Sequence, residues 1–143
     1  MSVDPRTLGW LARALNHEMS AVQQYLAQSV LARLWGDEPL ATSLRREAAE
    51  ELGHAEQLME RLIVLGVAPS AGNLAPARLG RSVDELLVAD RTLEVEAVHL
   101  YQQALAHVQR TRDGDSAALL AGILNEEIAH VQEIDHMAGQ THG

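Results

Sequence analysis

Apolar residues recur at spacings of three and four along four long stretches of this sequence. Such spacing places them on one face of a helix, and it is typical of helices that pack side by side. We expect helices over about 5–35, 39–65 and 82–112, and a fourth that follows 113–115 and ends near residue 138. Four Pro and ten Gly among 143 residues leave these stretches nearly unbroken, and the abundant Ala, Leu, Glu, Gln and Arg favour helix. The sequence therefore predicts an all-α protein.

Connection lengths set the expected order of the helices. Short turns at 36–38 and 113–115 make antiparallel hairpins of the first two and the last two helices. The segment 67–81 between the hairpins is rich in Pro, Gly, Ala and Ser. Fifteen extended residues reach ~50 Å, and a helix of about 27 residues is ~40 Å long, so this segment can cross the whole bundle. We expect one domain over 1–143, a ferritin-like bundle with a long crossover and no clear fifth helix, since only 139–143 follow the fourth.

Each of the four apolar faces contains one glutamate where a leucine would be expected. These residues are Glu18, Glu51, Glu94 and Glu127. A carboxylate in a bundle core without a partner costs several kcal/mol or becomes protonated. Four of them in one core are tolerable if cations lie among them.

Spacing adds a histidine to two of these helices and shows an internal repeat. Glu51-x-x-His54 recurs as Glu127-x-x-His130, and the offset between the two copies is 76 residues. The pairs at this offset are Glu18 and Glu94, Glu51 and Glu127, His54 and His130, Tyr25 and Tyr101, Val22 and Val98, and Leu44 and Leu120. The chain therefore consists of two copies of a helical hairpin, and we expect a symmetric site between them.

Two more Glu-x-x-His strings, Glu96/His99 and Glu133/His136, make the motif weak evidence by itself. They begin two and six residues after a glutamate of the apolar face, and are therefore turned ~200° and ~600° from it. We expect both on solvent-exposed faces. One Glu from each of two helices, with Glu-x-x-His from each of the other two, is the ligand set of di-iron carboxylate bundles.

The chemistry of iron explains these residue types. Glutamate oxygens hold both Fe(II) and Fe(III), and one histidine per metal adds a borderline donor at a fixed position. Four carboxylates balance two divalent cations in charge. The first Glu of each Glu-x-x-His motif is the natural bridge, the other two glutamates would be terminal, and open positions remain for O₂ or peroxide. The expected ligands of two Fe ions are Glu18, Glu51, His54, Glu94, Glu127 and His130.

Bulk composition excludes other kinds of site and partner. The absence of Cys rules out disulfides, thiolate zinc sites and iron–sulfur clusters. A net charge of −9 argues against nucleic acid and anionic membranes as partners and suits the attraction of cations. No apolar run approaches ~20 residues, so no membrane span is expected, and residues 1–10 lack the features of a signal peptide. We expect a cytoplasmic protein.

Further residues resemble the bacterioferritin subfamily of the ferritins over nearly the whole chain, with no gap needed from Glu18 to His130. The segments that carry the resemblance are Gln24-Tyr25, Leu34-Trp35-Gly36, Glu50-Glu51, His54-Ala55, Asp90 and Glu126-Glu127. The resemblance implies a ferroxidase centre inside the subunit, with Tyr25 beside it as an electron donor. Plain core packing is the alternative role for Tyr25.

Two departures from that subfamily qualify what the resemblance implies. Its members commonly bind haem at a twofold interface through a Met two residues before the first ligand histidine, and Leu52 stands there in this chain. Met59 lies further along the same helix, ~10 Å away, and Met as core filler is the ordinary use, so we expect no haem. The family's shells of 24 subunits also use a short fifth helix. A homo-oligomer is expected, but the sequence supports the prediction of a cage less strongly than the prediction of iron oxidation.

These observations favour a ferroxidase that converts Fe(II) to Fe(III), with O₂ or H₂O₂ as oxidant, for iron storage or detoxification. One alternative is a di-iron oxidoreductase or peroxidase that forms no cage. Another is a non-catalytic metal-binding subunit packaged in a different shell.

Overall fold

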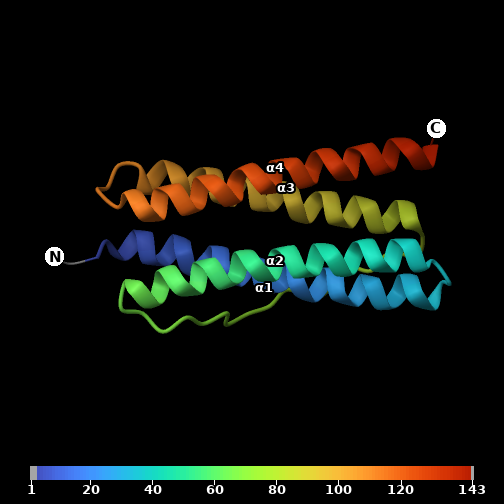
Figure 1. Cartoon of the computed structure of the whole chain (residues 1–143), viewed down its shortest axis with the longest axis horizontal. Helices are drawn as coiled ribbons and strands as arrows, with labels where there is room; N and C mark the ends of the chain where they lie inside the picture. Colours follow the sequence, from blue (N-terminus) through green and yellow to red (C-terminus); the bar gives the residue numbers. More distant parts are fainter. Residues whose placement is uncertain (1–2, 143) are drawn as a thin grey trace.

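This computed structural model describes residues 3–142 of the chain (Figure 1). Within that range the secondary structure consists of four long α-helices, and there is no strand. The helices are α1 (Pro5–Leu34), α2 (Glu38–Val64), α3 (Val83–Val108) and α4 (Gly114–His142). The helices α1 and α2 form one antiparallel hairpin, and α3 and α4 form the other. The predicted all-α bundle of two hairpins is confirmed.

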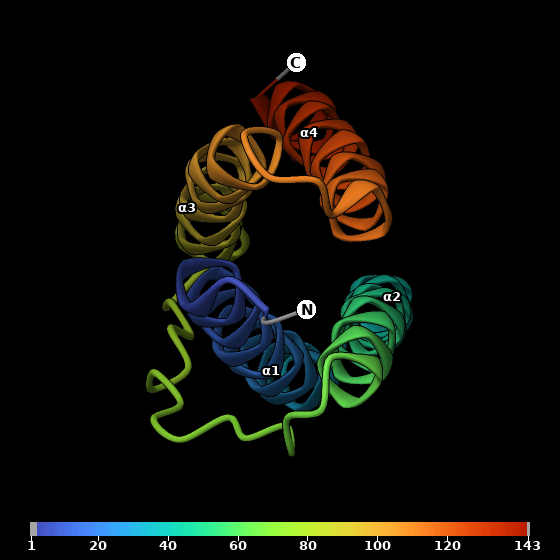
Figure 2. The same ribbon diagram turned by 90° about the vertical axis from the view of Figure 1, so that its left-hand side faces the viewer.

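The connection between the hairpins runs the length of the bundle. Residues 65–82 leave one end of α2, pass along the outside of α1 and enter α3 at the opposite end of the molecule (Figures 1 and 2). The helices α2 and α3 therefore run in the same direction, as the long crossover predicts.

Side chains of α1 hold this crossover by hydrogen bonds to its backbone. An extended segment without a neighbouring strand needs such partners, because unpaired backbone groups away from water are costly. The bonds join Asn16 with Asn73, Ser20 and Gln23 with Ala75, and Gln24 and Gln28 with Arg78. One face of α1 is therefore devoted to the linker.

Capping residues fix the start of α1 and the ends of both helices of the first hairpin. The Asp4 carboxylate accepts hydrogen bonds from the amides of Arg6 and Thr7, two of the donors that a helix start leaves unpaired. Gly36 and Gly66 follow the ends of α1 and α2 with φ of 83° and 88°. Glycine adopts this left-handed conformation without a steric penalty, which stops the helix.

The second hairpin differs from the sequence expectation at three helix ends. α3 ends at Val108 rather than near residue 112, and α4 begins at Gly114, inside the expected turn. Asp113 accepts backbone and side-chain hydrogen bonds from the first turn of α4 and so caps that start. Residues 139–142, expected beyond the last helix, continue α4. Within residues 3–142 there is no fifth helix.

The apolar core consists of two clusters, one toward each end of the bundle. The first contains Leu11, Leu15, Ala55, Leu58, Leu62, Ala97, Tyr101, Ala104, Leu120 and Ile123 among others. The second contains Ala21, Tyr25, Leu40, Leu44, Ala48, Leu86, Leu93 and Ile134 among others. Along each helix, a glutamate of the predicted site falls between residues of the two clusters. The middle of the bundle is therefore polar, and apolar layers close it on both sides.

The helix surfaces agree with the other expectations. Side chains of the two additional Glu-x-x-His strings, Glu96/His99 and Glu133/His136, are all exposed. In the described part of the chain, no helix has the length and apolar character needed to cross a bilayer.

Candidate metal centre

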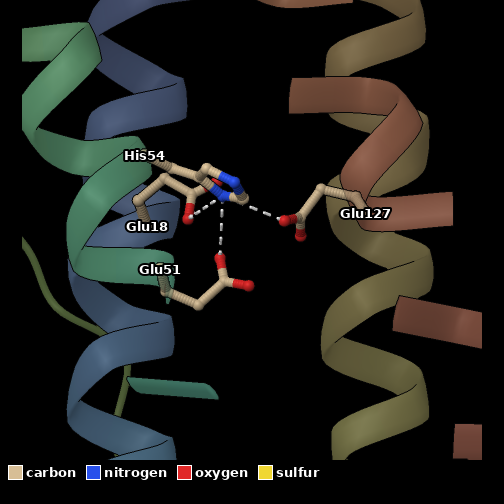
Figure 3. A group of neighbouring side chains, drawn as sticks. All are labelled: Glu18, Glu51, His54 and Glu127. Carbon is tan, nitrogen blue, oxygen red and sulfur yellow. Dashed lines mark ion pairs between the residues drawn. The ribbon is translucent and has the colours of Figure 1, made fainter. Parts of the chain in front are cut away.

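All six predicted ligands come together at the middle of the bundle, one or two from each helix. Glu18 lies on α1, Glu51 and His54 on α2, Glu94 on α3, and Glu127 and His130 on α4. Figure 3 shows side chains of the first hairpin pointing toward Glu127 from the second. Their exposed fractions are 0% for Glu18 and Glu51, 1% for Glu94 and Glu127, 3% for His54 and 6% for His130. The cluster is therefore shielded from bulk water.

The six residues form two overlapping groups, each with ligand atoms within 4.8 Å of one another. One group contains Glu18, Glu51, His54 and Glu127, and the other contains Glu51, Glu94, Glu127 and His130. Glu51 and Glu127 belong to both groups. This is the arrangement that two cations with shared carboxylates require.

Each histidine turns the same ring nitrogen toward the carboxylates. His54 Nδ1 lies 3.1 Å from Glu127 Oε1, and His130 Nδ1 lies 3.1 Å from Glu51 Oε1. Each Nδ1 is also 3.5–3.6 Å from the other carboxylates of its group. The two rings stack at 6.3 Å between centroids. The histidines thus reach across the interface between the hairpins from opposite sides.

The outward nitrogen of each histidine contacts a glutamate of the opposite hairpin. His54 Nε2 contacts Glu126, and His130 Nε2 lies 2.8 Å from Glu50 Oε2. A partner of this kind fixes the orientation and tautomer of a metal-binding histidine. Glu47 lies 3.6 Å from His130 as well, so this side carries a further carboxylate.

Buried polar atoms that make no hydrogen bond indicate a place for a cation among these residues. Each of the six side chains has a buried oxygen or nitrogen without a hydrogen-bond partner among residues 3–142; the atoms are Glu18 Oε2, Glu51 Oε1 and Oε2, His54 Nδ1, Glu94 Oε2, Glu127 Oε1 and His130 Nδ1. Buried polar atoms are almost always paired, and an exception suggests an unplaced ion. Oxygen and imidazole donors suit iron.

Tyrosines connect the two hairpins at this level. The Tyr25 hydroxyl on α1 donates to Glu94 Oε1 on α3 at 2.6 Å, and the Tyr101 hydroxyl on α3 donates to Glu18 Oε1 on α1 at 2.6 Å. Burial and then the nearby carboxylates raise the pKa of both phenols well above the ordinary value. Both tyrosines therefore remain protonated donors.

Without metal, the carboxylates at the centre have unequal proton affinities. Burial, followed by the charge of Glu51, raises the pKa of Glu18 well above its ordinary value. Burial and the contact with Glu94 raise the pKa of Glu127 to about 11. Glu51 differs from these two carboxyls: burial acts to raise its pKa, but contacts with Glu18 and both histidines outweigh burial and lower it.

The two histidines bind protons tightly in the same metal-free state. Burial alone would lower the pKa of each ring, but the surrounding carboxylates dominate. They raise the pKa of His130 to about 12, and that of His54 is raised as well. In the metal-free centre, bound protons therefore offset part of the negative charge that cations would otherwise neutralise.

A buried polar group accompanies Tyr25. The Gln24 amide donates to Asp90 Oδ1 at 3.0 Å, and Gln28 donates to the Arg78 carbonyl at 2.7 Å. Asp90 is 1% exposed, and burial raises its pKa to about 7. These residues link α1, α3 and the crossover next to the metal centre.

The position that the resemblance assigns to a haem ligand does not fit haem. Leu52 is 48% exposed on α2 and carries no sulfur. Met59 is partly buried and packs against the first apolar cluster. Leu52 therefore cannot ligate haem iron, and Met59 serves the packing of the core.

Sequence reasoning left out the residues that surround the ligands. Glu50 and Glu126 were part of the resemblance, but no role followed for them, and Glu47 had no signal. The offset of 76 residues also relates Glu50 to Glu126, and this relation could have marked them as a functional pair. Contacts of Tyr25 and Tyr101 with the opposite hairpin could not be obtained from spacing.

Comparisons with known proteins agree with this geometry. Residues 10–142 match the Ferritin family, the ferritin-like domain. The chain is 31% identical to Streptomyces coelicolor bacterioferritin, over 94% of this chain and 81% of that protein. It is 30% identical to Rhodobacter capsulatus bacterioferritin, over 94% and 84%. A solved structure of the latter matches with a TM-score of 0.94 and 28% identity, over 98% of this chain and 88% of that one.

Fold and site together define a ferritin-like protein. That solved structure is described with a metal-free dinuclear site and a haem iron in a crystallographic special position. The identity and coverage show that the chain belongs to the bacterioferritin family.

Proposed function

We propose that this protein is a ferroxidase that binds two Fe(II) ions per chain as substrate and oxidises them with O₂ or H₂O₂ for iron storage or detoxification. The observation that supports the proposal is the buried group of four glutamates and two histidines, whose unpaired atoms face one another across the hairpins. The names of the relatives reported above, which are bacterioferritins, support the same function.

Roles for the side chains follow from the overlap of the two groups. We assign Glu51 and Glu127, which belong to both, as bridges between the two ions. The remaining glutamates would each hold one ion, and Nδ1 of each histidine would complete the ligands of that ion. We call the ligands of one ion a half-site. The proposed ligands are Glu18, Glu51, His54, Glu94, Glu127 and His130.

The protein's own contribution is charge balance, orientation and the handling of protons. Four carboxylates neutralise two divalent cations, so the filled site avoids the cost of isolated buried charge. Iron must displace the protons that Glu18, Glu127 and the histidines hold. We also propose Tyr25 as an electron donor, since its hydroxyl already contacts a carboxylate of the centre.

Assembly and location extend the same proposal. We propose a homo-oligomeric, cytoplasmic protein with a single domain, and a 24-subunit cage as the form to test. Neither nucleic acid nor membrane is proposed as a partner, given the net charge of −9.

Anaerobic titration with Fe(II), followed by O₂, tests the function directly. We expect about two Fe(II) per chain to bind, one for each group of ligand atoms, and fast oxidation at that stoichiometry. Particle mass measured on the same sample separates a storage cage from a cage-free enzyme or a subunit of another shell. Binding without oxidation by O₂ or H₂O₂ would leave only a metal-binding role.

A further inference from the structure

We infer that Tyr101 is a second electron donor to the metal centre, so that this chain can reduce O₂ to water in one event with two tyrosines and two Fe(II). The inference rests on the proposed ferroxidase function and adds a residue and a product to it. Tyr25 alone would leave the four-electron reduction one electron short.

The geometry of Tyr101 repeats that of Tyr25 across the bundle. Each hydroxyl donates at 2.6 Å to a carboxylate oxygen of the opposite hairpin, Glu94 for Tyr25 and Glu18 for Tyr101. The two rings are 2% and 0% exposed. Each half-site therefore has one phenol in direct hydrogen-bond contact with one proposed ligand.

The use of aromatic residues in the core points the same way. The sequence contains two Tyr, two Trp and no Phe. Trp10 and Trp35 are partly exposed, so among the described residues the two tyrosines are the only buried side chains of these three types. Both lie at the metal centre with the hydroxyl turned toward it. If these rings only filled space, the core would offer many other apolar positions for them.

Tyr101 is also placed to hold an oxidised state away from water. It belongs to the first apolar cluster, whose other buried members are all aliphatic, among them Leu15, Leu58 and Leu120. Water and solutes that would quench a radical cannot reach a ring with 0% exposure. The contact with Glu18 gives the phenolic proton an acceptor when the electron leaves.

The electron count balances with both tyrosines. Reduction of O₂ to two H₂O takes four electrons and four protons. Two Fe(II) become two Fe(III), and two phenols become neutral phenoxyl radicals by giving one electron and one proton each; two further protons come from solvent. Each phenolic proton leaves through the carboxylate that it already contacts. Two more Fe(II) and two protons then restore the phenols, so four Fe(II) are oxidised per O₂.

Radical spectroscopy on the full chain tests the role of Tyr101. Protein loaded anaerobically with two Fe(II) per chain is mixed with O₂, frozen at short times and measured by electron paramagnetic resonance. Tyr101 is the only tyrosine in Tyr25→Phe, so a tyrosyl radical in that variant belongs to it. Each single variant receives a third Fe(II) per chain, so that three electrons from iron and one from the remaining phenol make the four that O₂ takes up. We expect a tyrosyl signal of similar yield in Tyr25→Phe and Tyr101→Phe, and none in the double variant. Released H₂O₂ should be absent in wild type and appear in the double variant.

Controls separate this role from a structural one. Each substitution removes one hydroxyl and keeps the ring, and Co(II) titration checks that every variant still binds two ions. Iron oxidation in all four proteins, with no tyrosyl signal in Tyr25→Phe, would overturn the role of Tyr101 and leave the ferroxidase function standing. Failure of wild type to oxidise Fe(II) would overturn both.

Discussion

The surroundings of Tyr25 and Tyr101 are alike where they meet the metal centre and differ outside it. Residues 76 apart should match if the repeat were complete. Beside Tyr25 lie three buried polar side chains, whereas the equivalent positions beside Tyr101 are apolar. The pairs that differ in this way are Gln24 and Leu100, Gln28 and Ala104, and Asp90 and Ala14.

The crossover explains this difference. It passes along α1 only, and its backbone at Arg78 bonds to Gln24 and Gln28. The second hairpin has no such segment to hold, so apolar packing is sufficient there. Ligand chemistry keeps the two halves alike at the centre, while the connection makes them different a few ångström away.

A second difference lies on the side where the histidines meet the outer glutamates. Glu47 adds a carboxylate near His130, whereas Ile123, the residue 76 positions after Glu47, is buried in the apolar core. Burial raises the pKa of Glu47 to about 7, with the charge of His130 opposing this rise. The two half-sites are therefore inequivalent in their polar surroundings.

The largest expected effect comes from the shared glutamates, where the halves are alike. Glu51→Ala and Glu127→Ala should each abolish fast Fe(II) oxidation, because each removes a ligand of both ions. The measurement is stopped-flow oxidation at two Fe(II) per chain. Glu133→Ala, on an exposed face, is the matched control and should oxidise iron normally. An unchanged rate in both Glu51→Ala and Glu127→Ala would contradict the assigned site.

A smaller effect is expected for the free energy of unfolding of the metal-free protein when Glu18, the hydrogen-bond acceptor of Tyr101, is replaced. Because the folded-state pKa of Glu18 is raised, the folded protein binds more protons than the unfolded chain above about pH 4.5, and stability falls as pH rises. Glu18→Gln imitates the protonated side chain and still accepts from Tyr101. It should match wild type near pH 4.5 and exceed it increasingly as the pH rises toward 7, by at most ~1.36 kcal/mol for each pH unit.

Urea unfolding of metal-free protein at several pH values measures this difference. Glu18→Gln should also lose metal binding. A variant that is more stable than wild type but inactive identifies the replaced residue as a functional ligand. Glu18→Leu, the simplest apolar replacement, is a poorer test, because it leaves the Tyr101 hydroxyl unpaired at a cost of ~1–3 kcal/mol. If Glu18→Gln unfolds more easily than wild type at pH 7, Glu18 is a satisfied structural group.

Beside Tyr25, the buried polar side chains Gln24 and Asp90 should stabilise the fold by about as much as one buried hydrogen bond. Asp90→Ala introduces the residue found at the equivalent position 14 of the first hairpin. It leaves the Gln24 amide without its acceptor, which costs ~1–3 kcal/mol. Combining Asp90→Ala with Gln24→Leu should recover part of this loss in urea unfolding. The double variant gives up the bond to Arg78, so proteases should cut 65–82 faster. Full additivity of the two losses would show that the residues are not coupled.

The smallest expected effect concerns the exposed face of the first hairpin. Haem added to purified protein should give no stoichiometric Soret band, because Leu52 has no thioether and Met59 packs against the core. Visible absorption after removal of excess haem is the measurement, and Leu52→Met is the variant that offers a sulfur. A full band in wild type that persists in Met59→Leu would mean that haem is held elsewhere.

The sequence by itself determined the helices, the hairpins and the six clustered residues. Periodicity specifies which face of a helix a residue occupies, so a glutamate on every apolar face had to point inward. The repeat of 76 residues then brought Glu51 and Glu127 to equivalent places. Length and composition of 67–81 were enough to predict the crossover.

Only the tertiary structure decided which residues touch across the hairpins. Tyr25 bonding to Glu94 rather than to Glu18, or His130 bonding to Glu50, depends on how far one hairpin slides along the other. That displacement is set by the packing of many apolar side chains, and no local spacing encodes it. Proton affinities at the centre follow from the same contacts, which is why the lowered pKa of Glu51 was not foreseen.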